Sequence, residues 1–267
     1  MVRGPRKHLK RLAAPKSWLL KKNKGVFAPR PSTGPHRLEE SIPLSLLLTD
    51  KLQYARTAKE VGNILKEKMI KINGRIRTDK RFPVGIFDVL SIPKTGEHYR
   101  LMYNVAGRFI LHQIGEEESK FRLAIVRKKR LRKGKVPYLY TNDGGSFSYC
   151  DQDIVPGDTV KVDLETGRIS EHLHVAIGNL AFIKKGRNMG CVGVVTNIEE
   201  KGIGDRKVYL VDKKERVFAT RQVNVYVIGP DGSSWISLPE GDGVKLSVFD
   251  ESNIRYEGET VKAAEGG

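Results

Sequence analysis

A long succession of short segments beyond Thr95 constrains the fold of this chain most. In each segment apolar residues alternate with polar ones, and Gly, Asp, Asn or Pro separates it from the next. A period of two is typical of half-buried β-strands, and strands that recur every 8 to 12 residues or so indicate small barrels. We expect strands at residues 99–105, 107–114, 120–126, 136–141, 159–164, 172–177, 180–183, 192–198, 207–212, 216–221, 223–228 and 244–249.

Between Ser41 and Leu65 the apolar residues change to helical spacing, with Pro43 suited to a first turn. Thr57 and Glu60 have the spacing of a capping box, which predicts a second helix directly after the first. The apolar positions that define the two helices are Leu44, Leu47, Leu48, Leu52 and Ala55, then Ala58, Val61, Ile64 and Leu65. With the strands, they make the expected fold class α+β.

Asn73 and Gly74 interrupt alternating isoleucines and cations, which is the strongest short signal for a β-hairpin. A two-residue loop would place Arg75 opposite Ile72. A three-residue loop with Gly74 in a bulge would pair Ile70 with Ile76 and separate an apolar face from a cationic one. We favour the three-residue loop for that separation.

The formal charge of +17 is clustered, which predicts an anionic partner such as a nucleic acid. Eleven Lys and Arg precede Glu39, the first carboxylate, and eight more lie in residues 122–135 with no acid among them. No membrane partner is expected, because the longest apolar run, residues 42–49, is far shorter than the roughly 20 residues that span a bilayer.

Five prolines among the first 40 residues exclude one continuous helix, so we expect residues 1–40 to form an extended basic arm. Its apolar residues are too many for a solvated tail and suggest that it becomes ordered against a partner. A disordered basic tail or an import signal is the alternative.

Residues 184–193, KKGRNMGCVG, form a basic, glycine-rich loop between expected strands. Glycine permits close approach of another backbone, so the loop could hold a phosphate on main-chain N–H groups while Lys184, Lys185 and Arg187 supply charge. A helix and the Gly-Lys-Ser/Thr sequence of a nucleotide-binding P-loop are both missing. An ordinary tight turn is the alternative interpretation.

Nothing else in the sequence indicates catalysis. His172 and His174 lack further residues at a recognised metal spacing, and the aspartates near residues 151–163 flank turns, where they serve local hydrogen bonding. Cys150 and Cys191 are too few for a disulfide framework, which indicates a reducing, intracellular compartment. We therefore expect no catalytic residue, no metal, no cofactor and no small-molecule substrate.

Two stretches resemble known RNA-binding modules. Residues 43–89, PLSLLLTDKLQ to GIFDV, resemble a helix-helix-hairpin module shared by a bacterial small-subunit protein, some pseudouridine synthases and tyrosyl-tRNA synthetases. Residues 174–199, HVAIGNLAFIKKGRNMGCVGVVTNIE, resemble a KOW motif. Together with residues 3–20, 218–229 and 235–248, they make nearly the whole chain similar to the S4e family of the eukaryotic and archaeal small ribosomal subunit.

This resemblance implies a noncatalytic ribosomal protein that binds 18S-type ribosomal RNA beside neighbouring small-subunit proteins. It implies cytoplasmic ribosomes, with nuclear and nucleolar transit in a eukaryote, and an arm threaded into the RNA. The expected division is an arm (1–40), a helix-hairpin module (41–95), a central β domain (96–172), a KOW-type, SH3-like barrel (173–212) and a C-terminal β segment (213–267). Alternatives are an RNA-modifying enzyme and a KOW-type transcription factor with the same modules.

The expected RNA contacts are cations beside phosphates, with Trp18 packed on a base or sugar. Deletion of residues 1–30 is expected to weaken incorporation into the subunit without unfolding the rest. The candidate RNA-binding residues are Arg3, Arg6, Lys7, His8, Lys10, Arg11, Lys16, Trp18, Lys21, Lys22, Arg56, Lys71, Asn73, Arg75, Arg77, Lys80, Arg81, Arg127, Lys128, Arg130, Lys184, Lys185, Gly186, Arg187, Asn188 and Gly190.

Overall fold

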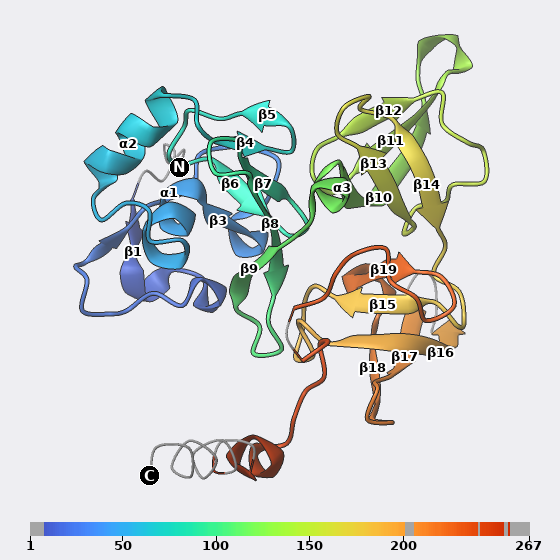
Figure 1. Cartoon of the computed structure of the whole chain (residues 1–267). Helices are drawn as coiled ribbons and strands as arrows, with labels where there is room; N and C mark the ends of the chain where they lie inside the picture. Colours follow the sequence, from blue (N-terminus) through green and yellow to red (C-terminus); the bar gives the residue numbers. More distant parts are fainter. Residues whose placement is uncertain (1–7, 201–205, 240, 254–255, 257–267) are drawn as a thin grey trace, which may run out of the picture.

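Antiparallel strand pairing organises the described part of the chain into three five-stranded sheets and two smaller ribbons (Figure 1). The structure is a computed structural model that describes residues 8–200, 206–239, 241–253 and 256. Arg3, Arg6 and Lys7 of the expected site lie outside these residues. The predicted α+β class is confirmed, and strands predominate over helices.

The first sheet has the order β5-β4-β7-β8-β9. Its strands are β4 (Lys71–Ile72), β5 (Arg75–Ile76), β7 (Val89–Ile92), β8 (Glu97–Tyr103) and β9 (Phe109–Gln113). The predicted boundary at 95/96 falls between β7 and β8, so this sheet joins the expected module to the strands that follow. Two ribbons accompany it, β1 (Leu9–Lys10) with β2 (Phe27–Ala28) and β3 (Ser41–Pro43) with β6 (Pro83–Gly85).

The second sheet has the order β12-β11-β10-β13-β14, and the third β18-β17-β16-β15-β19. The second contains β10 (Phe121–Leu131), β11 (Pro137–Thr141), β12 (Ser146–Ser148), β13 (Thr159–Asp163) and β14 (Ile169–Leu173). The third contains β15 (Leu180–Ile183), β16 (Val192–Glu200), β17 (Arg206–Val211), β18 (Val217–Arg221) and β19 (Val225–Gly229). The predicted boundary at 212/213 lies between two paired strands of the third sheet.

The strand expected at residues 244–249 is wrong, because the chain is helical over residues 248–253. The Asp250 N–H donates to Ser247 Oγ at 3.1 Å, and the Ser247 N–H donates to an Asp250 carboxylate oxygen at 3.4 Å. This reciprocal pair is a capping box, which satisfies free N–H groups at a helix start and favours the helix over a strand.

Besides the helical residues 248–253, the described fold has three short helices: α1 (Leu44–Leu46), α2 (Ala58–Lys66) and α3 (Glu116–Ser119). The predicted cap of α2 is confirmed, since the Glu60 N–H donates to Thr57 Oγ1 at 3.3 Å. The helix expected over 44–55 is shorter. After α1 it widens into a turn (Leu47–Lys51) in which the Leu52 N–H donates to the Leu47 carbonyl, and Gln53 with φ of 56° ends it. No helix of the described residues is long and apolar enough to cross a membrane.

The hairpin at Asn73–Gly74 has the two-residue loop, so the expected three-residue register is wrong. Lys71 pairs with Ile76 and Ile72 with Arg75, while Asn73 and Gly74 have φ of 50° and 74°, as a type I′ turn requires. The Asn73 side chain also accepts from the Val89 N–H at 2.9 Å. The turn geometry and these bonds to the Asp88–Val89 segment outweigh the separation of faces, and Ile76 is left exposed.

The arm folds onto the first sheet and contributes to the core of the protein. Trp18 is only 1% exposed, and its Nε1 atom donates to the Ser41 carbonyl at 2.6 Å. The expected contact of Trp18 with a base or sugar is therefore wrong. Leu9 and Ala28 are buried in the same cluster, so the expectation that residues 1–30 can be removed without unfolding the rest is also corrected.

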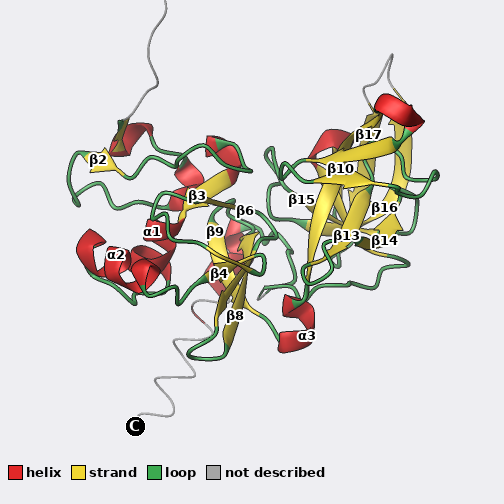
Figure 2. Ribbon diagram, turned by 90° about the horizontal axis from the view of Figure 1, so that it is seen from above, coloured by secondary structure: helices red, strands yellow, loops and turns green. Residues whose placement is uncertain are grey.

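Aromatic contacts and a hydrogen bond connect the regions of the three sheets. The Phe87 ring lies 5.3 Å from that of Phe182 and 4.9 Å from that of Tyr226, between centroids, and all three are fully buried. Between the second and third sheets, the Val227 N–H donates to Thr159 Oγ1 at 3.0 Å. Helices α1 and α2 lie on the side of the molecule away from β10 and β17, as Figures 1 and 2 agree. The second and third sheets lie on the other side and contact each other there. Arg37, at the end of the arm, lines a hollow together with residues of both sheets.

Candidate RNA-binding surface

A hollow of about 700 Å³ lies where the end of the arm meets the second and third sheets. We call it the basic cleft and define it by Arg37, Arg127, Lys128, Lys184 and Arg206, with Glu200 as a carboxylate on its rim. It brings together Arg127 and Lys128 from one predicted basic segment and Lys184 from the other, which are far apart in the sequence.

A β-bulge in β10 aims Arg127 into the cleft. Val126 pairs with Thr141 and Lys128 with Tyr140. Arg127 is therefore the extra residue of the bulge and has no pairing partner on β11. A bulge re-aims side chains and interrupts the alternation of faces. Arg127 and Lys128 therefore both line the cleft, although neighbours in a regular strand point to opposite faces.

Lys184 follows β15 directly and is only 6% exposed. Its Nζ atom lies 5.3 Å from the centroid of the Tyr226 ring. Burial is the main cause that lowers the pKa of Lys184; Glu40 raises this pKa, whereas Arg127 and Lys185 lower it. A nearly buried ammonium among other cations is stabilised by an anion, so a phosphate in the cleft would favour its charged form.

The glycines of the 184–193 loop have different roles. The Gly190 N–H donates to the Ile183 carbonyl at 2.8 Å, and a Cβ on Gly190 would come within 2.1 Å of the Asn104 oxygen. Gly190 thus permits close backbone packing, and its N–H is already paired. Gly186 is exposed with φ of 104°, between Lys185 and Arg187, which are exposed as well. Asn188 accepts from the Cys191 N–H and closes the loop.

A second basic hollow, of about 930 Å³, separates the arm from the helices. We call it the arm groove; its cations are Arg11, Lys21, Lys24, Lys51 and Arg56. Arg11 has a structural role, because its Nε donates to the Gly25 carbonyl and its Nη2 to the Lys24 carbonyl, each at 3.0 Å. The other predicted arm residues lie on the outside of the arm: His8, Lys10, Lys16 and Lys22.

The hairpin cations are only partly free for RNA. Arg75, Lys80 and Arg81 are exposed, and Lys71 is half-buried. Arg77 lies over the Phe82 ring, 4.5 Å from its centroid. Asn73 donates to the Asp88 carboxylate at 2.7 Å and belongs to the internal scaffold of the hairpin.

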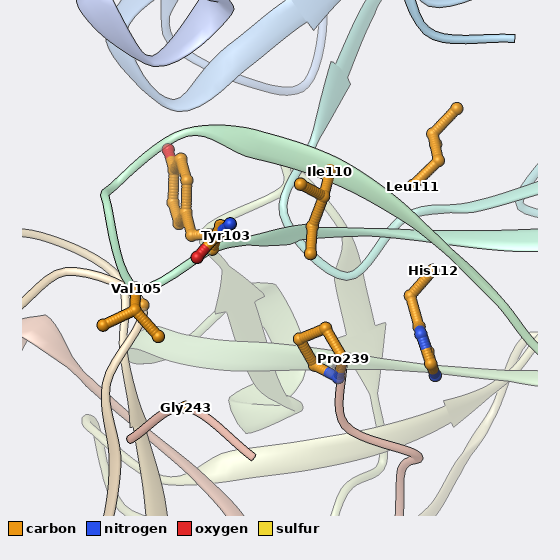
Figure 3. Close-up of a pocket in the computed structure, with 9 residues that line it drawn as sticks. Tyr103, Val105, Ile110, Leu111, His112, Pro239 and Gly243 are labelled. Atoms are coloured by element: carbon orange, nitrogen blue, oxygen red, sulfur yellow. The ribbon is translucent and has the colours of Figure 1, made fainter. Parts of the chain in front are cut away.

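Figure 3 shows a third hollow, of about 310 Å³, between the β8–β9 hairpin on one side and Pro239 and Gly243 on the other. Tyr103, Val105, Ile110 and Leu111 line it together with Pro239, and His112 stands at one end. The His112 Nε2 atom lies 3.0 Å from Ser237 Oγ, so its polar group contacts the C-terminal segment. The lining is mostly apolar and carries no Lys or Arg, so we assign the hollow to packing rather than to RNA.

Sequence reasoning missed several members of these surfaces, namely Arg37, Lys24, Lys51 and Arg206. Arg37 and Lys24 belong to the acid-free first 38 residues, so charge clustering could have included both. Lys51 and Arg206 stand in mixed-charge surroundings and become part of a basic surface only through folding. Among the described residues, His172 and His174 meet ring to ring at 5.1 Å, and no three possible metal ligands are grouped.

Comparisons with known proteins agree on one family. Three family models match the chain: the RS4NT domain at residues 3–39, ribosomal family S4e at residues 95–169, and the 40S ribosomal protein S4 C-terminus at residues 212–259. The small ribosomal subunit protein eS4 of Ixodes scapularis is 48% identical over 257 residues, which cover 96% of this chain and 98% of that protein.

The fold is similar to that of a solved relative. The crystal structure of the 30S ribosomal protein S4e from Thermoplasma acidophilum is 29% identical, with a TM-score of 0.63. The match covers 74% of this chain and 99% of the other. Since similarity to the tick protein extends over nearly the whole of both chains, the protein belongs to the S4e family of the small ribosomal subunit.

Proposed function

We propose that this protein is a noncatalytic constituent of the small ribosomal subunit that binds 18S-type ribosomal RNA and supports subunit assembly and translation. Family membership supports the ribosomal role. The observation that carries RNA binding is the basic cleft, in which a nearly buried Lys184 lies beside Arg37 and Arg127. Phosphate is the anion that RNA offers at high density.

The contacts are made mainly by positive charge. The cleft and the arm groove hold sugar-phosphate backbone, and Arg75, Lys80 and Arg81 extend the surface along the hairpin. Lys185, Gly186 and Arg187 form the exposed end of the loop beside the cleft. Trp18 and Asn73 support this surface from within, because their polar groups are bonded to the protein.

The other parts of the proposal follow from the same role. Neighbouring small-subunit proteins are the protein partners, and no substrate is converted. The protein acts in cytoplasmic ribosomes, and in a eukaryotic cell it passes through the nucleus and nucleolus during assembly. A KOW-type barrel around residues 173–212 remains part of the proposal.

Cosedimentation of the full-length protein with small subunits tests this function. Cosedimentation at moderate salt concentration does not distinguish specific from nonspecific binding, because a protein of charge +17 adheres to any RNA. In a gradient at about 0.5 M KCl, where simple charge contacts are strongly weakened, we expect the protein to remain with the subunits. Arg127→Glu should reduce the bound fraction, and Lys213→Glu, at a site where Lys213 pairs with Asp242, should not. A protein free of subunits at this salt concentration would contradict the proposal.

A further inference from the structure

The outer face of strands β10, β11 and β12 combines aromatic rings with cations. Tyr140 lies opposite Lys128 on one side and Ser146 on the other, and Tyr138 lies between Arg130 and Ser148. Residues two apart on a strand point to the same face. We call this surface the tyrosine face; its residues are Lys128, Arg130, Arg132, Tyr138, Tyr140, Ser146 and Ser148.

The opposite face of the same strands forms the core of the second sheet. Leu139, between the two tyrosines, is fully buried, and Phe147 packs against the same cluster with Val126. Tyr138 and Tyr140 remain half-buried outside that cluster. The tyrosines are therefore not required to fill the interior, and their rings are available on a firm sheet.

Arg132 lies across both rings. Its guanidinium carbon is 4.5 Å from the centroid of Tyr138 and 5.5 Å from that of Tyr140, and its Nε donates to the Tyr140 hydroxyl at 2.7 Å. A guanidinium is planar and stacks on aromatic faces. A nucleic-acid base can stack on the guanidinium, or on a ring once Arg132 turns towards a phosphate.

The segment that carries this face has few carboxylates, and the exposed Asp151 and Asp153 follow directly after it. Between Phe121 and Cys150 the sequence has one carboxylate, Asp143, which is buried and paired with Arg122. Lys128 and Arg130, by contrast, are exposed next to the tyrosines. The β10–β11 hairpin also extends beyond the rest of its sheet, which makes the face accessible to a large partner (Figure 1).

We propose that the tyrosine face binds a single-stranded segment of RNA, with unpaired bases stacked on Tyr138, Tyr140 and Arg132 and with Lys128 and Arg130 on the adjoining phosphates. The inference rests on the proposed RNA-binding function and names the class of RNA bound at this surface. Duplex RNA conceals the faces of its bases, so exposed rings on a sheet favour unpaired nucleotides. The two tyrosines are about 6.6 Å apart along the strand, which suits neighbouring bases in an extended chain.

The test compares the full-length protein on two RNAs of equal length. The first is a labelled ten-nucleotide CA repeat, which cannot pair with itself, and the second is a blunt RNA duplex. We expect the double variant Tyr138→Ala/Tyr140→Ala to bind the CA repeat about 10-fold or more weakly at about 0.3 M salt, since each stacked base contributes a factor of this order. Its affinity for the duplex should change less than about twofold, because phosphate contacts remain.

Two controls isolate the rings. Tyr138→Phe/Tyr140→Phe keeps stacking and should bind the CA repeat within about threefold of the unaltered protein, since only an exposed hydrogen bond is lost. Tyr149→Ala removes a tyrosine that is 80% exposed and lies outside the face, and should have no effect. Equal losses on both RNAs would show that the face contacts only phosphates, and an unchanged affinity for the CA repeat would also overturn the proposal.

A further variant and a spectroscopic signal test stacking without relying on a loss of binding, which unfolding of a variant could also cause. Ser148→Tyr places a third ring beside Tyr138 and should tighten binding of the CA repeat several-fold. Replacement of adenine by 2-aminopurine in the repeat should give quenched fluorescence on binding, and no quenching would contradict stacking. If the unaltered protein cosediments with subunits in high salt while the alanine variant binds the repeat normally, the inference fails and the proposed function stands.

Discussion

His36 and Asp88 form a buried pair that joins the end of the arm to the hairpin module, with 2.9 Å between His36 Nε2 and a carboxylate oxygen of Asp88. The same carboxylate accepts from the Gly85 N–H at 2.8 Å and from the Asn73 side chain at 2.7 Å. One side chain therefore holds the arm, the β6 turn and the hairpin loop in a fixed relation, which positions the cations on all three.

The Asp88 pair predicts a dependence of stability on pH. Burial would raise the pKa of Asp88, but His36, Asn73 and the Gly85 N–H together hold it below its ordinary value. A carboxyl whose pKa is lower in the folded protein contributes stability above its unfolded pKa of about 3.9, and the contribution is lost as the pH falls through the folded pKa. The difference in unfolding free energy between the unaltered protein and Asp88→Asn should therefore be fully present above about pH 5 and should shrink as the pH falls below about 4. Urea unfolding at several pH values measures this, and a difference that grows on acidification would contradict it.

Trp18 predicts that the arm stabilises the fold before any RNA binds. Trp18→Ala should lower the free energy of unfolding by about 3 to 5 kcal/mol, because it empties a buried site and leaves the Ser41 carbonyl without its donor. Leu12→Ala is the matched control, since Leu12 is 88% exposed on the same arm, and it should change stability by less than about 0.5 kcal/mol. Denaturant unfolding without RNA distinguishes the two variants. Equal stability for both would mean that the arm is not part of the folded core.

Two glycine substitutions should have opposite effects. Gly74 has φ of 74°, so Gly74→Ala should destabilise the protein by about 1 kcal/mol, although a Cβ there would meet only ordinary contacts at 3.6 Å or more. Gly62 lies inside α2 with nothing within 4 Å of an added Cβ, so Gly62→Ala should stabilise it by about 1 kcal/mol. Thermal unfolding measures both. A Gly74→Ala variant as stable as the unaltered protein would argue against the two-residue turn.

The capping box at Thr57 and most strands could be predicted from the sequence, because each depends on residues close together in the chain. The hairpin register could not, since it was decided by bonds from Asn73 to Asp88 and Val89, which the spacing of isoleucines does not contain. The helix after Ser247 was missed for a different reason. Ser247 and Asp250 have the spacing of a capping box, but Val244, Leu246 and Val248 alternate around them as in a strand.

The site shows the same division between local and distant causes. Clustered charge identified Arg127, Lys128 and Lys184, yet only the bulge in β10 and the meeting of two sheets bring them into one cleft. The internal role of Trp18 could not be predicted from the sequence, because the Ser41 carbonyl to which it donates lies 23 residues away in the chain. The pairing of tyrosines with cations on one face likewise required the strand register.

The basic cleft predicts a specific change in the salt dependence of RNA binding. Arg127→Ala should lower the slope of log K against log salt concentration by about 1, which is the loss of one phosphate contact, and should weaken binding similarly for different RNA sequences. Lys213→Ala removes a surface cation that pairs with Asp242 away from the cleft, and should leave the slope unchanged. Titrations at four or five salt concentrations provide the slopes. The same loss for both variants would indicate nonspecific charge rather than a defined cleft.

Ultraviolet crosslinking of purified small subunits that contain this protein tests the central claim most directly, because it identifies the residues in contact with RNA inside the assembled particle. We predict crosslinked peptides that include residues 125–130 on β10 and residues 183–188 at the end of β15 and in the loop after it, where the basic cleft lies. Crosslinks confined to residues 207–219 of β17 and β18, with none in the cleft segments, would contradict the account.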